Sequence, residues 1–193
     1  ITLLLNREPQ SFSESFCKAH GPCVSSMGWR VKDEEHALNL ALKRGAKEVK
    51  TGDYELKDSK KKLAAISGIG ESLIYLVRKR SSFYEELGFE ALKQPELVET
   101  KGFTVIDHLT NNVYHGTMEK WSNFYKNIFE FTEVRYFDIR GLKTGLTSYA
   151  LKSPCGKFCI PINEASEKKS QINEYLDEYK GPGVQHIAFL SDD

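Results

Sequence analysis

Two histidines occupy positions from which a side chain could hold a metal ion. His108 lies in "VIDHLTNNV" and His186 lies in "GVQHIAF", and both stretches carry the branched apolar residues typical of a buried strand. The chain has three other histidines. We expect His20 and His36 on helix surfaces or caps and His115 in a turn, so attention falls on the two strand histidines.

The pleat of a strand predicts which neighbours accompany each imidazole. Every second side chain lies on the same face of an ideal strand. Ile106 and Thr110 are therefore expected on the face of the first strand histidine, and Val184 and Ala188 on the face of the second. Both imidazoles should point out of the sheet beside small or apolar neighbours.

Metal binding is the chemistry that two such imidazoles would support. Iron(II) oxygenases hold their metal with two imidazoles and one carboxylate on one face, which leaves positions open for substrate and oxygen. Rigid strands supply such ligands better than mobile loops. A single strand histidine is more often a hydrogen-bonded core residue, whereas two on separate strands of one sheet favour a metal site. Spacing alone leaves both interpretations open.

The composition is that of a folded protein with balanced charge. The chain has 193 residues, of which 40% are hydrophobic and 28% charged, enough for one sizeable core or two small domains. Lysine plus arginine equals aspartate plus glutamate at 27 each, so no basic excess indicates a nucleic-acid partner. No apolar segment approaches the ~20 residues of a membrane span.

The cysteines and the first residues bear on the compartment. Cys17, Cys23, Cys155 and Cys159 have spacings that fit neither a CxxC pair nor a dense disulfide scaffold, so we expect reduced thiols in a cytoplasmic protein. The opening "ITLLLNREP" starts inside an apolar run with no Met or basic leader, unlike a signal peptide. We expect it to be a strand cut in the middle, and both ends of the chain to be cuts.

Short strand-like runs alternate with amphipathic segments along the chain. Helices are expected at residues 12–20, 33–44, 118–129 and 170–179, with Asp33 as a good N-cap for the second. Strands are expected at residues 3–5, 24–31, 48–50, 63–67, 72–77, 103–110, 134–139, 147–152, 157–162 and 184–190. Periodicity is lost around residues 94–102, which we interpret as a linker. It would divide an amino-terminal domain, residues 1–100, from a second domain, residues 101–193.

A weak internal repeat accompanies this pattern. "GPCVSSMGWRVKD" aligns without gaps with "GPGVQHIAFLSDD", 160 residues later, and in both copies a helix is expected to end at the Gly-Pro pair before a strand. This favours a duplicated structural unit. The alignment places Ser26 opposite His186, so only one copy has a side chain suited to a metal.

Longer motifs resemble one enzyme family over the whole chain. "TVIDHLTNNV", "RYFDIRGLKTGLTSYALKSPCGKFCIPINE", "KKSQINEYL" and "GPGVQHIAFLSDD", together with "REPQSFSESFCKAHGP" and "SGIGESLIYLV", are similar to the 4-hydroxyphenylpyruvate dioxygenases. The resemblance implies an α+β fold of repeated βαβββ modules of the vicinal-oxygen-chelate (glyoxalase/bleomycin-resistance) type, truncated here at both ends. It also implies that only the carboxy-terminal domain binds metal, which would account for Ser26.

The resemblance extends to site residues. It implies Fe(II) as the cofactor, with His108 and His186 as two ligands and a glutamate from a later segment, absent from this chain, as the third. Residues matching the family's substrate pocket are Ser148 in "GLTSYAL", Asn163 in "PINE", Gln171 in "KSQI" and Gln185 in "GVQH". An ideal pleat points the last of these away from the face of His186, so a twist or bulge would be needed.

The implied reaction converts 4-hydroxyphenylpyruvate and O2 into homogentisate and CO2, a step of tyrosine and phenylalanine catabolism. A cytoplasmic homo-oligomer with no membrane or nucleic-acid partner is expected, and this chain alone is expected to be inactive. One alternative is a 4-hydroxymandelate synthase-like enzyme with the same substrate, although "IPIN" looks more like the dioxygenase. The other is a metal-free binding or interaction domain of the same fold.

Overall fold

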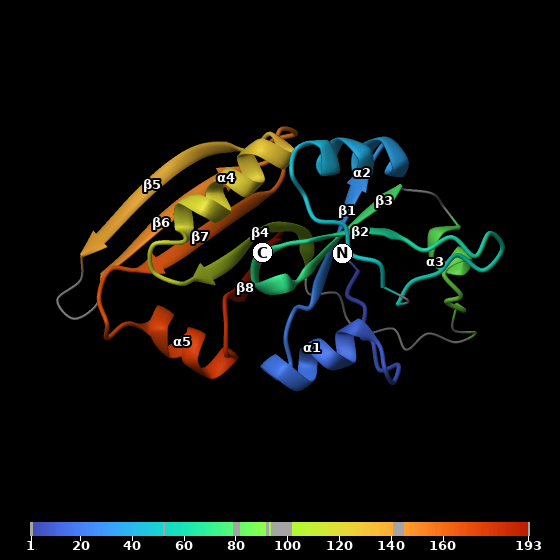
Figure 1. Cartoon of the computed structure of the whole chain (residues 1–193), viewed down its shortest axis with the longest axis horizontal. Coiled ribbons are helices and arrows are strands. Elements are labelled where there is room, and N and C mark those ends of the chain that lie inside the picture. The colour runs from blue at the N-terminus through green and yellow to red at the C-terminus, as the bar shows by residue number, and fades with distance from the viewer. Residues whose placement is uncertain are drawn as a thin grey trace.

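Two β-sheets lie side by side, with helices between them and below them in the view of Figure 1. The computed structural model describes residues 2–51, 53–78, 82–91, 93, 102–140 and 145–192, and the side chains within these ranges except those of residues 135–140. Of the expected linker at residues 94–102, only Gly102 falls within the described residues.

The helices follow the periodicity of the sequence closely. Within the described residues the α-helices are α1 (Phe12–His20), α2 (Glu34–Lys43), α3 (Phe83–Glu86), α4 (Met118–Phe129) and α5 (Gln171–Tyr179), and η1 (Ile69–Glu71) is a 3-10 turn. The expected helices at 12–20 and 118–129 are confirmed to the residue. The helices expected from residues 33 and 170 begin one residue later, because Asp33 and Ser170 are their N-caps and accept from the backbone N–H of His36 and Asn173.

The strands were also mostly placed correctly. They are β1 (Ser26–Val31), β2 (Ala64–Ser67), β3 (Leu73–Arg78), β4 (Phe103–Val113), β5 (Thr132–Arg140), β6 (Gly145–Lys152), β7 (Cys159–Ala165) and β8 (Gly183–Ser191). The expectation of strands at residues 3–5 and 48–50 is wrong. Leu3 and Leu5 belong to no strand and are 72% and 76% exposed, and Glu48 forms only a single bridge with Ile66. An apolar run becomes a strand only where a partner satisfies its backbone.

The sheet topology confirms the expected α+β fold. The first sheet has the order β1-β3-β2, with β1 parallel to β3. The second has the order β5-β6-β7-β4-β8. The succession β4, α4, β5, β6 and β7 is one βαβββ module whose first and last strands pair in parallel. Strand β8 then adds antiparallel to the free edge of β4.

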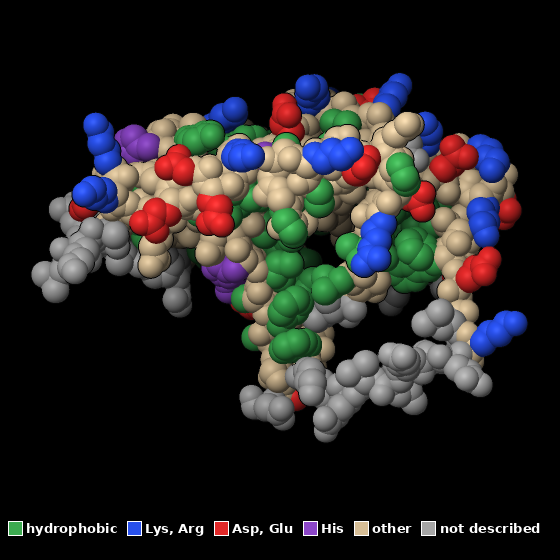
Figure 2. Space-filling model, turned by 90° about the horizontal axis from the view of Figure 1, so that it is seen from below, with side chains coloured by type: hydrophobic (Ala, Val, Ile, Leu, Met, Phe, Trp, Pro, Cys, Tyr) green, Lys and Arg blue, Asp and Glu red, His purple; other side chains and the backbone are tan. Residues whose placement is uncertain are grey.

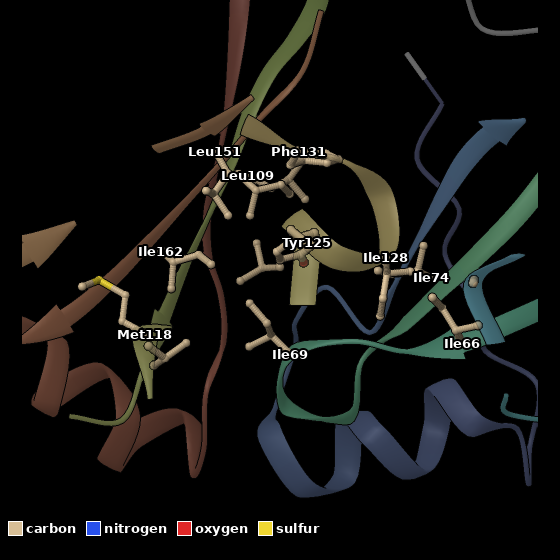
Figure 3. Close-up of a cluster of buried hydrophobic side chains, with 14 of the residues drawn as sticks. Ile66, Ile69, Ile74, Leu109, Met118, Tyr125, Ile128, Phe131, Leu151 and Ile162 are labelled. Carbon is tan, nitrogen blue, oxygen red and sulfur yellow. The ribbon is translucent and has the colours of Figure 1, made fainter. Parts of the chain in front are cut away.

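One hydrophobic core joins the two sheets. Ile66 and Ile74 of the first sheet belong to the same buried cluster as Leu109 and Ile162 of the second, and Tyr125 of α4 is fully buried between them (Figure 3). Burying such side chains contributes roughly 1.5–3 kcal/mol each. Helix α4 is therefore one of the elements that tie the sheet carrying His108 to the rest of the chain.

The two copies of the sequence repeat lie next to each other. Helices α1 and α5 both end at a Gly-Pro pair, after which the chain enters β1 and β8. The ring of His20 stacks on Tyr179 with centroids 4.5 Å apart, and its Nδ1 lies 2.7 Å from the carbonyl oxygen of Tyr179. The helix, Gly-Pro and strand context expected from the alignment is thus present in both copies.

All four cysteines are free thiols. No helix among the described residues is long and apolar enough to cross a membrane. On the face seen in Figure 2, basic and acidic side chains are interspersed, in keeping with the net charge of zero.

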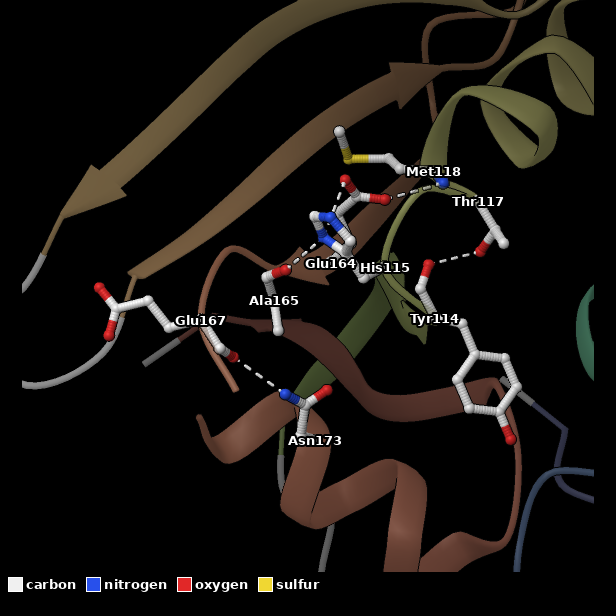
Figure 4. Close-up of polar contacts among 8 residues, drawn as sticks. All are labelled: Tyr114, His115, Thr117, Met118, Glu164, Ala165, Glu167 and Asn173. Atoms are coloured by element: carbon white, nitrogen blue, oxygen red, sulfur yellow. Dashed lines mark hydrogen bonds and ion pairs between the residues drawn. The ribbon is translucent and has the colours of Figure 1, made fainter. Parts of the chain in front are cut away.

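The amino terminus of α4 is capped by a side chain from a neighbouring strand. Thr117, the N-cap residue, makes no side-chain cap. Instead Glu164 of β7 accepts a hydrogen bond from the backbone N–H of Met118 at 3.0 Å, and its other oxygen lies 3.9 Å from Nδ1 of His115 (Figure 4). A carboxylate at this end also favours the helix dipole. Glu164 therefore fixes α4 against the sheet.

We expect Glu164→Ala to lower the free energy of unfolding by about 1 kcal/mol, the usual cost of losing a helix cap. Urea denaturation followed by circular dichroism would measure this. Glu167→Ala is the matched control, because that side chain is exposed and points away from α4 in Figure 4. Equal losses in the two variants would contradict the capping role.

A second prediction concerns the contact between the first sheet and the entry to β8. Gly70 has φ of +61°, and a Cβ there would lie 2.0 Å from the carbonyl oxygen of Pro182. Gly70→Ala should therefore cost at least about 3 kcal/mol of unfolding free energy. Gly45 also has a positive φ, of +98°, but open space around it. Gly45→Ala should cost only about 1–2 kcal/mol of backbone strain. Similar losses of unfolding free energy in the two variants would contradict the close contact between Gly70 and Pro182.

Candidate metal centre

The two strand histidines meet across the antiparallel pair β4 and β8. His186 pairs with Thr110, and His108 pairs with Ala188, so each histidine faces the residue two positions beyond the other. This arrangement has a local twofold axis through the pair between them, Leu109 and Ile187. The imidazoles lie on the same face, with Nε2 atoms 3.3 Å apart and ring planes inclined at 77°.

A β-bulge immediately precedes each histidine. Between the pairs Ile106–Phe189 and His108–Ala188, β4 advances two residues while β8 advances one, so Asp107 is the extra residue. Between the pairs formed by Thr110 and Asn111, β8 instead advances two residues, and Gln185 is the extra one. A bulge of this kind sets two residues of one strand opposite a single partner and re-aims a side chain.

The bulges correct the face assignment made from an ideal pleat. Ile106 and Val184 were expected beside the histidines, but both pack with the hydrophobic core on the opposite face. Thr110 does lie on the histidine face, as expected, with its hydroxyl 3.0 Å from Nε2 of His186. Gln185, which the pleat would point away, is brought to the histidine face. Of the twist or bulge that this placement of Gln185 would need, the structure shows a bulge.

The residue that precedes each histidine in the chain forms a hydrogen bond with the Nδ1 atom of its imidazole. Nδ1 of His108 lies 2.7 Å from Oδ2 of Asp107, and Nδ1 of His186 is bonded to Oε1 of Gln185. Carboxylate and amide oxygens only accept hydrogen bonds, so each Nδ1 must be the donor. Each Nε2 then carries a lone pair, and the two lone pairs converge on one region of space.

This geometry fits a divalent metal ion. Metal–imidazole bonds of about 2.1 Å at a right angle place two nitrogens roughly 3.0 Å apart, close to the 3.3 Å between the Nε2 atoms. Burial and, secondarily, the neighbouring His108 lower the pKa of His186, which favours the neutral imidazole that a metal requires. Among the described residues, no group of three His, Cys, Asp or Glu side chains could hold a metal; the two imidazoles supply two ligands.

A row of polar side chains continues along the same sheet. Ser148 of β6 pairs with Asn163 of β7, which pairs with Asn112 of β4 and donates to its Oδ1 at 3.4 Å. Asn112 lies four residues beyond His108. The bulge at Thr110 and Asn111 puts its extra residue on β8 and none on β4, so the row shares the histidine face. Ser148 and Asn112 are buried. Two of the residues expected to contact substrate therefore lie together.

Gln171 is the expected substrate residue that the structure leaves apart. It is exposed at the first position of α5 and forms no hydrogen bond with the other described site residues. The structure also brings Asp107, Thr110 and Asn112 into the site, although the sequence predicted no role there for them. Strand parity from His108 placed Thr110 on its face and could have placed Asn112 there too. Only the bulge reveals Asp107.

Comparison with known proteins supplies an independent view of the chain. Residues 1–93 match the family described as hydroxyphenylpyruvate dioxygenase, HPPD, N-terminal. Residues 105–193 match the glyoxalase/bleomycin resistance protein/dioxygenase superfamily. The two matches together cover most of the chain.

Individual relatives agree with these families. Protein MelA of Shewanella colwelliana is 56% identical over 100% of this chain and 55% of its own length. The 4-hydroxyphenylpyruvate dioxygenase of Pseudomonas sp. strain P.J. 874 is 46% identical over 100% of this chain and 54% of its own length. The chain thus spans about half the length of the curated relatives it matches.

Solved structures share the fold. A mutant of 4-hydroxymandelate synthase from Streptomyces coelicolor superposes with a TM-score of 0.78 at 20% identity, over 97% of this chain and 55% of that one. At this identity the match speaks for the architecture and not for the reaction.

Proposed function

The chain belongs to the 4-hydroxyphenylpyruvate dioxygenase family, and we propose that the protein is an Fe(II)-dependent dioxygenase. Its reaction would convert 4-hydroxyphenylpyruvate and O2 into homogentisate and CO2, in the cytoplasmic catabolism of tyrosine and phenylalanine. In this proposal residues 101–193 form the first part of the metal-binding domain, and residues 1–100 form a domain without a metal site.

The observation that carries the proposal is the convergence of two imidazoles whose Nε2 atoms both act as acceptors. His108 and His186 come from different strands, point their Nε2 atoms at one region and have their Nδ1 atoms already occupied. The Thr110 hydroxyl can donate to Nε2 of His186, but two acceptors that point at each other are not a usual arrangement for histidines without a ligand role. The arrangement suits two of the three protein ligands of a non-haem iron site.

The iron, when bound, would supply chelation of a 2-oxo acid and activation of O2. The chain's own residues would hold and orient the reactants. His108 and His186 would bind the metal through Nε2. Ser148 and Asn163 would offer a hydroxyl and an amide to the substrate from the buried row on the same face. Such groups hydrogen-bond a phenol or a keto acid without competing strongly for iron.

The two glutamines complete the proposed substrate contacts. Gln185 uses Oε1 on His186, which leaves its amide N–H groups to donate to the substrate. Gln171 would act from the exposed first turn of α5. The third metal ligand is proposed to be a glutamate outside these residues, and the active protein a homo-oligomer.

The metal assignment predicts a loss of iron binding when either imidazole is removed. His186→Ala and His108→Ala in the full-length protein should each weaken Fe(II) binding by at least roughly 100-fold, because one of the few protein ligands is lost. Anaerobic titration calorimetry would measure the affinity. His115→Ala is the control, since that side chain is 75% exposed and its Nδ1 lies 2.9 Å from the carbonyl oxygen of Ala165, outside the site. Unaltered affinity in His186→Ala would count heavily against the assignment.

The product separates the proposed reaction from its nearest alternative. Full-length protein supplied with Fe(II), O2 and 4-hydroxyphenylpyruvate should release homogentisate, detected by chromatography and mass spectrometry. 4-Hydroxymandelate as the main product would replace the proposed reaction with the synthase reaction. Absence of turnover together with absence of iron binding would instead support a metal-free binding domain.

A further inference from the structure

We propose that Asp107 and Gln185 are positioning residues that set the tautomer and ring orientation of the two histidines. The inference deepens the proposed function and rests on it, since it concerns how His108 and His186 are prepared for a metal. It assigns one shared role to the two bulges of β4 and β8, because each brings an acceptor oxygen behind the imidazole that follows it.

Neighbouring side chains along a regular strand do not normally contact each other. Adjacent side chains normally lie on opposite faces of a sheet, so a residue cannot reach the ring of the next residue. The extra residue at each bulge changes this. Asp107 and Gln185 turn to the same face as their histidines, and their oxygens reach the Nδ1 atoms. Without the bulges neither contact would form.

The hydrogen-bond partner of an imidazole determines which of its two nitrogens carries the proton. A neutral ring carries its proton on either Nδ1 or Nε2, and the partner of one nitrogen decides which form is present. An acceptor oxygen at Nδ1 holds the proton there and leaves the Nε2 lone pair for a metal. Because both oxygens act in the same way, both histidines are prepared alike before any ion arrives.

The arrangement of the two sites is symmetric. The histidines and their bulges are related by the local twofold axis of the β4–β8 pair. Phe103 and Val105 of β4 flank a further register shift at Thr104, where no histidine follows. Irregular pairing is therefore not special to the histidines in this ladder. What distinguishes the two sites is an acceptor oxygen in contact with the imidazole of the next residue, whereas the Thr104 hydroxyl donates to the carbonyl oxygen of Leu190.

The two acceptors differ in charge, which makes the inference specific. Asp107 offers a carboxylate and Gln185 a neutral amide oxygen. Charge-assisted hydrogen bonds are stronger than neutral ones, although the Asp107 side chain is 47% exposed and water weakens the difference. The amide at the equivalent position on β8 indicates that an oxygen, and not a charge, is the minimum requirement. Asp107→Asn should therefore retain the function that Asp107→Leu loses.

The test is the histidine tautomer in the metal-free protein. Protein labelled with nitrogen-15 at histidine would be studied by long-range proton–nitrogen NMR, with signals of His108 and His186 identified from their Gln variants. In the unaltered protein both rings should carry the proton on Nδ1. In Asp107→Leu, His108 should shift to a mixture rich in the Nε2–H form that free histidine favours, while His186 stays unchanged. Asp107→Asn should resemble the unaltered protein.

A second measurement links the tautomer to metal binding. Co(II) affinity of the full-length protein should fall 10- to 100-fold in Asp107→Leu, the usual effect of losing a partner of a metal-binding histidine, and less than about threefold in Asp107→Asn. Thr104→Val is the control for damage to the irregular ladder and should leave both readouts unchanged. Circular dichroism would verify that each variant is folded.

The outcomes separate this inference from the proposed function. If His108 in folded Asp107→Leu keeps its Nδ1–H form, or if Asp107→Asn loses it as completely as Asp107→Leu does, the positioning role is overturned. If the tautomers respond as expected, the inference stands even in a protein that binds no Co(II). Absence of Co(II) binding together with the expected tautomers would contradict only the proposed iron site.

Discussion

The antiparallel pairing of β4 with β8 is the constraint on which the site depends. It brings together segments 78 residues apart and sets the Nε2 atoms of His108 and His186 3.3 Å apart. A slip of one residue would turn the side chains of one strand to the other face and separate the imidazoles. The twofold register and the bulges before each histidine are therefore features of a single ladder.

The rest of the fold holds this ladder in place. β4 is an inner strand between β7 and β8, and its Leu109 and Val113 belong to the same buried cluster as Met118, Tyr125 and Ile128 of α4. β8 is at the edge of the sheet in the described chain and has fewer supports. Tyr175 of α5 donates to the carbonyl oxygen of Val184 at 3.1 Å, and the turn at Gly70 packs against Pro182 just before β8 begins. The first sheet, which carries none of the proposed ligands, thus helps to position the strand that carries one.

Several side chains of the site are polar although they lie in a buried part of the sheet. Thr110, Asn112 and Ser148 are buried, and buried polar groups need partners. Thr110 contacts His186, and Asn112 accepts from Asn163. A row of this kind adds little to a core, where apolar residues of the same size would serve better. The row lies beside the two imidazoles, where the proposed substrate would bind.

Much of this could be predicted from the sequence, because local periodicity and long motifs are properties of the chain itself. The apolar stripe of Met118–Phe129 determined a helix to the residue, the cap at Asp33 marked a helix start, and the motifs around His108 and His186 indicated the family. The strand at residues 3–5 could not be excluded, since whether an apolar run pairs depends on a partner elsewhere. The face of Gln185, the role of Asp107 and the core position of Ile106 were decided only in the tertiary structure. Bulges arise from the register between two strands, and register is a relation between distant segments that neither segment encodes alone.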